Sequence, residues 1–186
     1  MMVAIVIGLG ANLPSGSDAP IETLQRAVHM VAEQVGPDPV CSPWYASTPV
    51  GVSGQPDFVN GAVRLDTELD AATLLATLHR IEDRLGRTRN TRWGPRVVDL
   101  DLLVYGDRLL PDARLWRQVA EATDETAFLD VPVVPHPRLH KRLFALQPLK
   151  DIWPDWSHPL TGKSIARMIN EIEGRQLLYP LGPGTG

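Results

Sequence analysis

Two aspartates near the middle of the chain, Asp99 and Asp101, are separated by one leucine and continue into an apolar segment. On a β-strand, residues i and i+2 point to the same side, so the two carboxylates would lie about 7 Å apart on one face. Like charges at that range repel each other, and a divalent cation would relieve the repulsion. Paired acids with arginines nearby suit a phosphate bridged by magnesium. For an isolated Asp-x-Asp, a solvated strand end is the alternative interpretation.

The residues just before these acids are rich in arginine. The chain has 186 residues and a formal net charge of −4, yet six arginines fall between Arg80 and Arg96. The planar guanidinium group binds oxyanions in a bidentate manner, so this segment favours a phosphate ligand. A solvated helix-to-loop face paired with Glu82 and Asp83 is the alternative. The negative net charge gives no reason to expect a nucleic acid or a membrane as partner.

The composition is that of one globular domain spanning residues 1–186, since 44% of the residues are hydrophobic. Cys41 is the only cysteine, which excludes an internal disulfide and a thiolate metal cluster. The first ten residues have no basic start and no long apolar stretch, which argues against a signal peptide. No apolar run approaches the length of about 18 residues that a membrane helix requires. We therefore expect a cytoplasmic protein.

The elements that must hold the charged residues follow from hydrophobic periodicity and from breakers. The pattern β-α-β-β-α-β is the ferredoxin-like arrangement, so we predict an α+β fold with helices packed on one face of a sheet and additional C-terminal helices. The core is expected at about residues 3–150, residues 111–130 as an insertion and residues 180–186 as a frayed end. Strands are predicted at residues 3–7, 40–45, 57–65, 97–105 and 131–134, and helices at 20–36, 70–86, 142–149 and 164–172.

Two other motifs lack a residue that their chemistry requires. Residues 8–13, Gly-Leu-Gly-Ala-Asn-Leu, begin like a dinucleotide-binding fingerprint but have leucine at the third glycine position. We therefore interpret residues 8–18 as a plain strand-to-loop turn. His136 and His140 have the spacing of zinc ligands, but Pro137 interrupts the helix that such ligands need.

What remains is the Asp-x-Asp strand, the arginine loop before it and a Pro-His-Pro loop with Arg142 after it. Together with residues 55–60, Gln-Pro-Asp-Phe-Val-Asn, it closely resembles the 6-hydroxymethyl-7,8-dihydropterin pyrophosphokinase family of folate biosynthesis. The resemblance runs from Val3 to about Pro148. Its centre is residues 92–101, Arg-Trp-Gly-Pro-Arg-Val-Val-Asp-Leu-Asp.

This resemblance implies an ATP-dependent pyrophosphokinase, a transferase that passes a pyrophosphoryl group from ATP to the hydroxymethyl oxygen of the pterin and leaves AMP. ATP would be the co-substrate, and Asp99 and Asp101 would hold two Mg²⁺ ions. Since little covalent work remains for the protein, positioning and electrostatics would dominate. The resemblance assigns phosphate contacts to Arg87, Arg89 and Arg96. It assigns nucleotide contacts to Glu82, Trp93, His136 and Arg142.

A pterin is a flat, polar ring that needs aromatic faces for stacking and amides for its edge. By resemblance, Phe58 and Phe144 are the stacking partners and Asn60 binds the edge. Ser47 and Val50 match positions whose backbone lines the pterin pocket. Taken alone, the two phenylalanines are more often core residues, whereas an amide within an apolar strand needs partners.

Two loops, residues 47–56 and 87–93, are polar and carry glycine or arginine. We expect both to close over the substrates and exclude water. The expected partners are small molecules, ATP and the reduced pterin alcohol, and we expect a monomer. Two alternatives stay open, another two-metal enzyme such as a nucleotidyltransferase, and a non-catalytic ferredoxin-like nucleotide-binding module.

Overall fold

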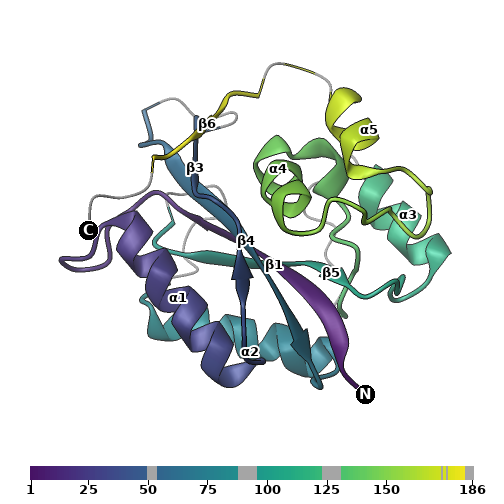
Figure 1. Ribbon diagram of the computed structural model, residues 1–186, viewed down its shortest axis with the longest axis horizontal. Helices are drawn as coiled ribbons and strands as arrows, with labels where there is room; N and C mark the ends of the chain where they lie inside the picture. The colour runs from purple at the N-terminus through teal and green to yellow at the C-terminus, as the bar shows by residue number, and fades with distance from the viewer. Residues whose placement is uncertain (50–53, 88–95, 123–130, 173, 175, 183–186) are drawn as a thin grey trace.

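The centre of the molecule is an antiparallel sheet whose first strand, β1 (Val3–Ala11), lies in its interior (Figure 1). β1 is apolar and rich in β-branched residues, which suit a buried strand, and it pairs antiparallel with β4 and β5. The structure is a computed structural model that describes residues 1–49, 54–87, 96–122, 131–172, 174 and 176–182. The described strands besides β1 are β2 (Val40–Cys41), β3 (Tyr45–Ser47), β4 (Phe58–Thr67), β5 (Asp99–Tyr105) and β6 (Leu178–Pro180).

The strands are arranged in the order β5-β1-β4-β3-β6, with β2 also paired to β4. The chain passes from β1 through a helix to β3 and β4, and then through a second helix to β5. β1 and β5, the first and last strands of this β-α-β-β-α-β unit, are neighbours in the sheet. All pairs in this order are antiparallel. This arrangement confirms the predicted ferredoxin-like α+β fold.

Two helices, α1 (Pro20–Gln34) and α2 (Ala71–Arg84), cover one face of the sheet (Figure 1). The fixed φ of a proline suits the first position of α1. The carboxylate of Asp70 accepts two backbone N–H groups of the first turn of α2. Gly86 follows α2 with a φ of +91°, which glycine adopts without strain. Both helices and the sheet share one buried core that includes Ile5, Ile7, Leu24, Val31, Leu74, Leu78, Ile81 and Leu100.

The opposite face of the sheet carries the additional C-terminal helices that were predicted. α4 packs on β4 and contacts α5, and α3 lies beside them (Figure 1). The sheet needs this cover because its second face is also apolar. A second core joins sheet and helix residues, among them Val6, Ala62, Leu103, Val104, Leu146, Leu149 and Met168. The elements are α3 (Ala113–Glu121), a 3-10 turn (Leu139–Lys141), α4 (Leu143–Ile152) and α5 (Ile165–Asn170).

β1 is longer than predicted. We interpreted residues 8–18 as a loop, but β1 continues to Ala11 because Gly8 and Gly10 keep the extended backbone and pair with both neighbours. Its register with β5 shifts between Val6 and Ile7, as at a β-bulge.

Other predicted boundaries changed as well. Residues 40–45 were predicted as one strand, but β2 ends at Cys41 and β3 begins only at Tyr45, and the strand predicted at 131–134 reduces to a bridge between Leu110 and Val134. Residues 111–130, which showed no clear period, contain α3. The predicted tail at residues 180–186 begins with Pro180, the last residue of β6, a strand that we did not predict.

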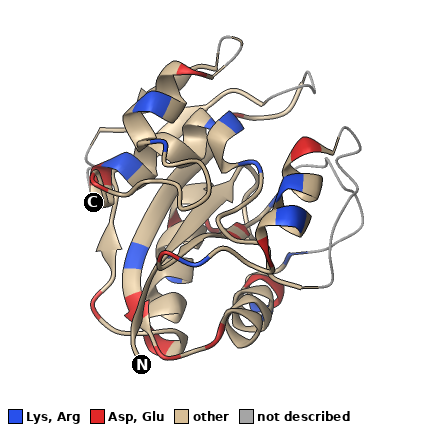
Figure 2. Ribbon diagram, turned by 90° about the vertical axis from the view of Figure 1, so that its right-hand side faces the viewer, with Lys and Arg blue, Asp and Glu red and all other residues tan. Residues whose placement is uncertain are grey.

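Charged residues of both signs lie in both helical layers (Figure 2), which agrees with the small net charge. Within the described ranges, no helix is both long and apolar enough to cross a membrane.

Candidate active site

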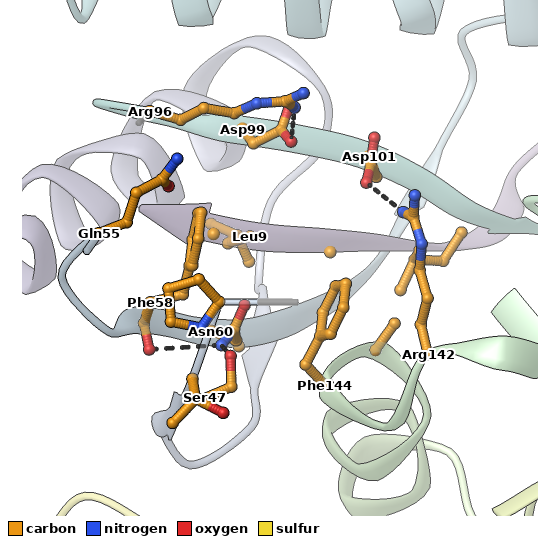
Figure 3. A pocket seen from close by; sticks show the side chains of 17 residues that line it. Leu9, Ser47, Gln55, Phe58, Asn60, Arg96, Asp99, Asp101, Arg142 and Phe144 are labelled. Atoms are coloured by element: carbon orange, nitrogen blue, oxygen red, sulfur yellow. Dashed lines mark hydrogen bonds and ion pairs between the residues drawn. The ribbon is translucent and has the colours of Figure 1, made fainter. Parts of the chain in front are cut away.

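A pocket lies on the sheet face that α4 covers, between that helix and strands β1, β3, β4 and β5 (Figure 3). Residues far apart in the sequence meet here because the three longest strands of the sheet are neighbours at this point. Of the residues predicted for the site, the structure places the following in the pocket lining: Ser47, Phe58, Asn60, Arg96, Asp99, Asp101, Arg142 and Phe144.

The floor of the pocket is formed by glycines of β1 that were not predicted as site residues. A Cβ atom on Gly8 would lie 3.1 Å from Leu103 Cδ1, and one on Gly10 would lie 3.5 Å from Asn60 Oδ1. The absence of side chains on Gly8 and Gly10 therefore leaves room on this face of β1. Their i, i+2 spacing was the available signal, but in the sequence it suggested only a dinucleotide-binding turn.

The two acids of β5 both line the pocket, while Leu100 between them is buried in the core on the other side. Asp99 forms ion pairs with Arg96 and with Arg87, the latter at 2.8 Å. Asp101 pairs more loosely with Arg142, at 3.4 Å. The Asp101 side chain is also more exposed, 37% against 22% for Asp99, so it is the more accessible of the two carboxylates.

Burial raises the pKa of Asp99, and the negative charge of Asp101 raises it further, whereas Arg96 and Arg87 act in the opposite direction. Two acids are thus held together on one wall, with arginines compensating part of their charge. Oxygen ligands of this kind fit Mg²⁺, which uses one or two carboxylates together with water and substrate phosphates. In the described part of the chain, no three or more acidic, histidine or cysteine side chains form a group that could hold a metal ion without other ligands. Mg²⁺ held here would take further ligands from substrate phosphates and water.

Glu82 lies behind this wall rather than in the pocket. Its side chain is fully buried at the end of α2, and its Oε1 accepts the Leu100 N–H at 2.7 Å and pairs with Arg87. Burial raises the pKa of Glu82 to about 7, although Arg87 opposes the shift. The geometry differs from the expected nucleotide contact, because the α2 face that carries Glu82 is the one that packs on β5. Glu82 reaches the pocket through Arg87, which also holds Asp99.

His136 is held by the backbone next to the same wall. Its N–H donates to the Leu103 carbonyl at 2.9 Å, and its Nδ1 accepts the Arg138 N–H at 3.2 Å. Burial and the positive charge of Arg142 keep the pKa of His136 well below its usual value, which favours the neutral ring. His136 does not line the pocket, whereas Arg142 does, with its guanidinium 5.6 Å from the centre of the Phe144 ring.

The other end of the pocket is built from uncharged groups. Asn60 is 4% exposed, and its Nδ2 donates to Ser47 Oγ at 2.8 Å. β3 and β4 bring the two together because Ser47 pairs with Phe58 and Tyr45 with Asn60. Figure 3 shows Phe58 and Phe144 on either side of Asn60, one from β4 and one from α4. An amide between two aromatic rings can bind the edge of a flat, polar heterocycle.

Three predicted site residues, Val50, Arg89 and Trp93, lie outside the described residues, as do parts of the two loops that we expected to close over the substrates. Several lining residues were not assigned from the sequence. Among these, Gln55 belongs to the segment 55–60 that carries the resemblance. The others contribute small or apolar surface and gave no chemical signal: Leu9, Thr48, Pro49, Gly61, Leu103 and Ala145.

The chain is similar to proteins of one family. The model of the family described as 7,8-dihydro-6-hydroxymethylpterin-pyrophosphokinase matches residues 6–154. The 2-amino-4-hydroxy-6-hydroxymethyldihydropteridine pyrophosphokinase of Synechocystis sp. is 38% identical over 180 residues, which cover 96% of this chain and 80% of that protein. The protein of the same name from Haemophilus influenzae is 32% identical over 178 residues, covering 95% of this chain and 98% of its own length.

Solved structures show the same fold. Plasmodium falciparum HPPK-DHPS, wild type, superposes with a TM-score of 0.65 at 15% identity and covers 91% of this chain. The chain spans less than half of that longer protein, 44% of its length. The resemblance read from the arginine and Asp-x-Asp segment is confirmed by the family model and by the similar sequences. The chain belongs to the 7,8-dihydro-6-hydroxymethylpterin-pyrophosphokinase family.

Proposed function

We propose that this protein transfers the pyrophosphoryl group of ATP to the hydroxymethyl oxygen of 6-hydroxymethyl-7,8-dihydropterin, which yields the pterin diphosphate and AMP in folate biosynthesis. The observation that supports this best is a single pocket with two chemically different ends. Carboxylates and arginines line one end, and two aromatic rings with a buried amide line the other. A polyphosphate and a flat heterocycle could therefore bind next to each other.

At the charged end, the arginines exchange partners. Arg96 and Arg142 now pair with Asp99 and Asp101, and phosphate oxygens accept the same donors in a bidentate manner. The exchange frees Asp99 Oδ2 and Asp101 Oδ2 to hold two Mg²⁺ ions. Bound magnesium would neutralise phosphate charge and help to align the attacking and leaving oxygens. Arg87, which joins Glu82 to Asp99, adds positive charge beside the phosphates.

At the uncharged end, Phe58 and Phe144 hold the pterin ring between them, and Asn60 binds its edge. Because Asn60 Nδ2 already donates to Ser47, its Oδ1 is the atom that accepts a hydrogen bond from the ring. A buried carbonyl without this partner would be costly, which favours a ring with N–H groups on its edge. The hydroxymethyl group then points toward the charged end, where positioning alone brings it close to the phosphate.

The direct test is incubation with ATP, Mg²⁺ and the reduced pterin alcohol, followed by separation of the nucleotide and pterin products. We expect AMP and pterin diphosphate in equal amounts, with neither formed when the pterin is omitted. Release of pyrophosphate with a nucleotidylated product would identify a nucleotidyltransferase instead. Binding of ATP without any turnover would favour the non-catalytic module.

The finer expectations about the protein's state belong to the same proposal. We propose that it acts as a monomer in the cytoplasm, on these small molecules and without nucleic acid or membrane as partner. Light scattering coupled to size-exclusion chromatography measures the mass of the particle in solution. A mass of twice the 20.5 kDa of one chain would contradict the monomer.

A further inference from the structure

Asn12 contacts residues at both ends of the pocket but does not itself line the cavity. Its side chain is buried, with 2% of its surface exposed. Its Nδ2 donates to Gln55 Oε1 at 3.3 Å and to the Pro56 carbonyl at 3.2 Å. Its Oδ1 accepts the Arg96 N–H at 2.8 Å. One amide therefore joins two segments, each of which is more than forty residues away from Asn12 in the sequence.

Residues 12–13 hold the Arg96 backbone by hydrogen bonds at both its N–H and its carbonyl. Besides the bond to Asn12 Oδ1, the Arg96 carbonyl accepts the N–H groups of Asn12 and Leu13, at 2.9 and 3.2 Å. The peptide groups on either side of Arg96 are thus fixed in orientation. Its guanidinium pairs with Asp99 at the charged end, so Asn12 controls where that charge is presented.

The second segment held by Asn12 leads into the uncharged end. Gln55 lines the pocket, and Pro56 lies two residues before Phe58, one of the two rings. The topology explains why one residue reaches both segments. β1 lies between β4 and β5 and ends at Ala11, so the next residue lies between the start of β4 and the segment that precedes β5.

We propose that Asn12 is a positioning residue that fixes the distance and orientation between the pterin end and the phosphate end of the pocket. This inference rests on the proposed function. Transfer requires the acceptor oxygen to lie close to phosphorus and in line with the leaving group, and small displacements reduce the rate strongly. A single rigid amide shared by both ends keeps them in register without contacting either substrate.

Two substitutions separate the two halves of this link. Asn12→Asp keeps an oxygen that accepts the Arg96 N–H but places a second carboxylate oxygen against two acceptors, Gln55 Oε1 and the Pro56 carbonyl. Asn12→Ala removes both halves. Thr67→Val is the matched control, because Thr67 is equally buried, donates to the Val35 carbonyl at 2.7 Å and lies at the far end of β4.

The experiment measures kcat, both KM values and the affinity and stoichiometry of a non-hydrolysable ATP analogue by titration calorimetry. For Asn12→Asp we expect the pterin KM to rise about tenfold while the affinity for the analogue stays within about threefold of the unsubstituted protein. For Asn12→Ala we expect kcat to fall at least about tenfold at a stoichiometry near one, so that a smaller folded fraction does not explain the loss. Thr67→Val should change melting temperature without changing kcat or either KM.

If both Asn12 variants keep kcat and both KM values within about threefold per folded molecule, Asn12 only stabilises the fold and the inference is wrong. Equal weakening of both substrates by Asn12→Asp would also overturn it. If Asn12→Ala does not fold, judged by circular dichroism, Asn12→Asp decides the question by its selective effect on the pterin. Failure of the unsubstituted protein to form AMP would instead reject the proposed function, and the two failures are therefore distinguishable.

Discussion

The two ends of the pocket are built from different parts of the chain. The charged end takes two acids from one strand: Asp99 and Asp101 lie two residues apart on β5, so strand alternation alone places both on one wall, and Arg96 lies three residues before Asp99. The uncharged end takes Ser47 from β3, Asn60 from β4 and the Phe144 ring from α4. Only the sheet register and the position of α4 bring these side chains together. The acids for phosphate chemistry are thus close together in the sequence, whereas the residues for ring recognition meet only in the tertiary structure. Substitutions at the two ends should therefore change different kinetic constants.

The largest effect is expected at the charged end. Asp99→Ala or Asp101→Ala should lower kcat by about a hundredfold to a thousandfold, because an electrostatic contact to the transferring group is lost. The fold should persist, since neither side chain belongs to either apolar core. AMP formation measured at saturating substrates gives kcat, with the exposed Asp155→Ala as the matched control. Near-normal turnover in either variant would show that the acids do not hold the metal.

A smaller but more selective effect is expected at the uncharged end. Asn60→Ala should raise the pterin KM by tenfold or more, on the scale of about 1–3 kcal/mol for a lost buried hydrogen bond, and should leave the KM for ATP unchanged. Ser47→Ala should have a weaker effect in the same direction, because it loosens the Asn60 amide without removing it. Steady-state kinetics with each substrate varied in turn measure both constants. Equal changes in both KM values would contradict the division of the pocket into two ends.

Arg142 lies between the two ends, since it pairs with Asp101 and lies over the Phe144 ring. Arg142→Lys keeps the charge but loses the planar, bidentate group. We expect the KM for ATP to rise about tenfold, with a smaller rise in the pterin KM from the lost contact with the ring. Arg117→Lys on the exposed side of α3 is the control. An effect on the pterin alone would place Arg142 at the uncharged end only.

The same contrast explains how much of the site could be predicted from the sequence. The spacing of Asp99 and Asp101 is a local pattern, and strand geometry alone predicts that both acids share one wall. Asn60 was noticed because an amide in an apolar strand requires partners, but its partner Ser47 became visible only through the register of β3 with β4. Glu82 was assigned to the nucleotide, whereas it packs behind β5, because a helix pattern does not show which neighbour a buried acid will contact.

The central helices and strands of the fold were predictable because their hydrophobic periodicity is strong. β6 was not, since three residues with little alternation become a strand only by pairing with β3 at the edge of the sheet. Gly8 and Gly10 suggested a turn, although their lack of side chains serves a pocket floor in a continuous strand. Asn12 gave no signal, because its role depends on partners 43, 44 and 84 residues away.

The smallest expected effect concerns stability, through a buried histidine that packs against α3. His158 is 1% exposed and packs edge-on against Trp116 at 4.8 Å between ring centres. Burial, together with the charge of His140, lowers the pKa of His158 to about 4. Since the unfolded chain has a histidine pKa of about 6.5, it binds more protons than the folded chain between pH 6.5 and 4. The free energy of unfolding therefore falls as the pH is lowered through this range.

Between pH 7 and pH 5, the His158 contribution should amount to about 1–2 kcal/mol, measured by denaturant unfolding at each pH. In His158→Gln the fall over the same interval should shrink by that amount, whatever the variant's stability at pH 7, because the glutamine does not titrate. Burial also lowers the pKa values of His136 and His140, so part of the fall should remain. A fall of unchanged size would show that His158 gains its proton without unfolding, and that its surroundings open to solvent more readily than their packing indicates.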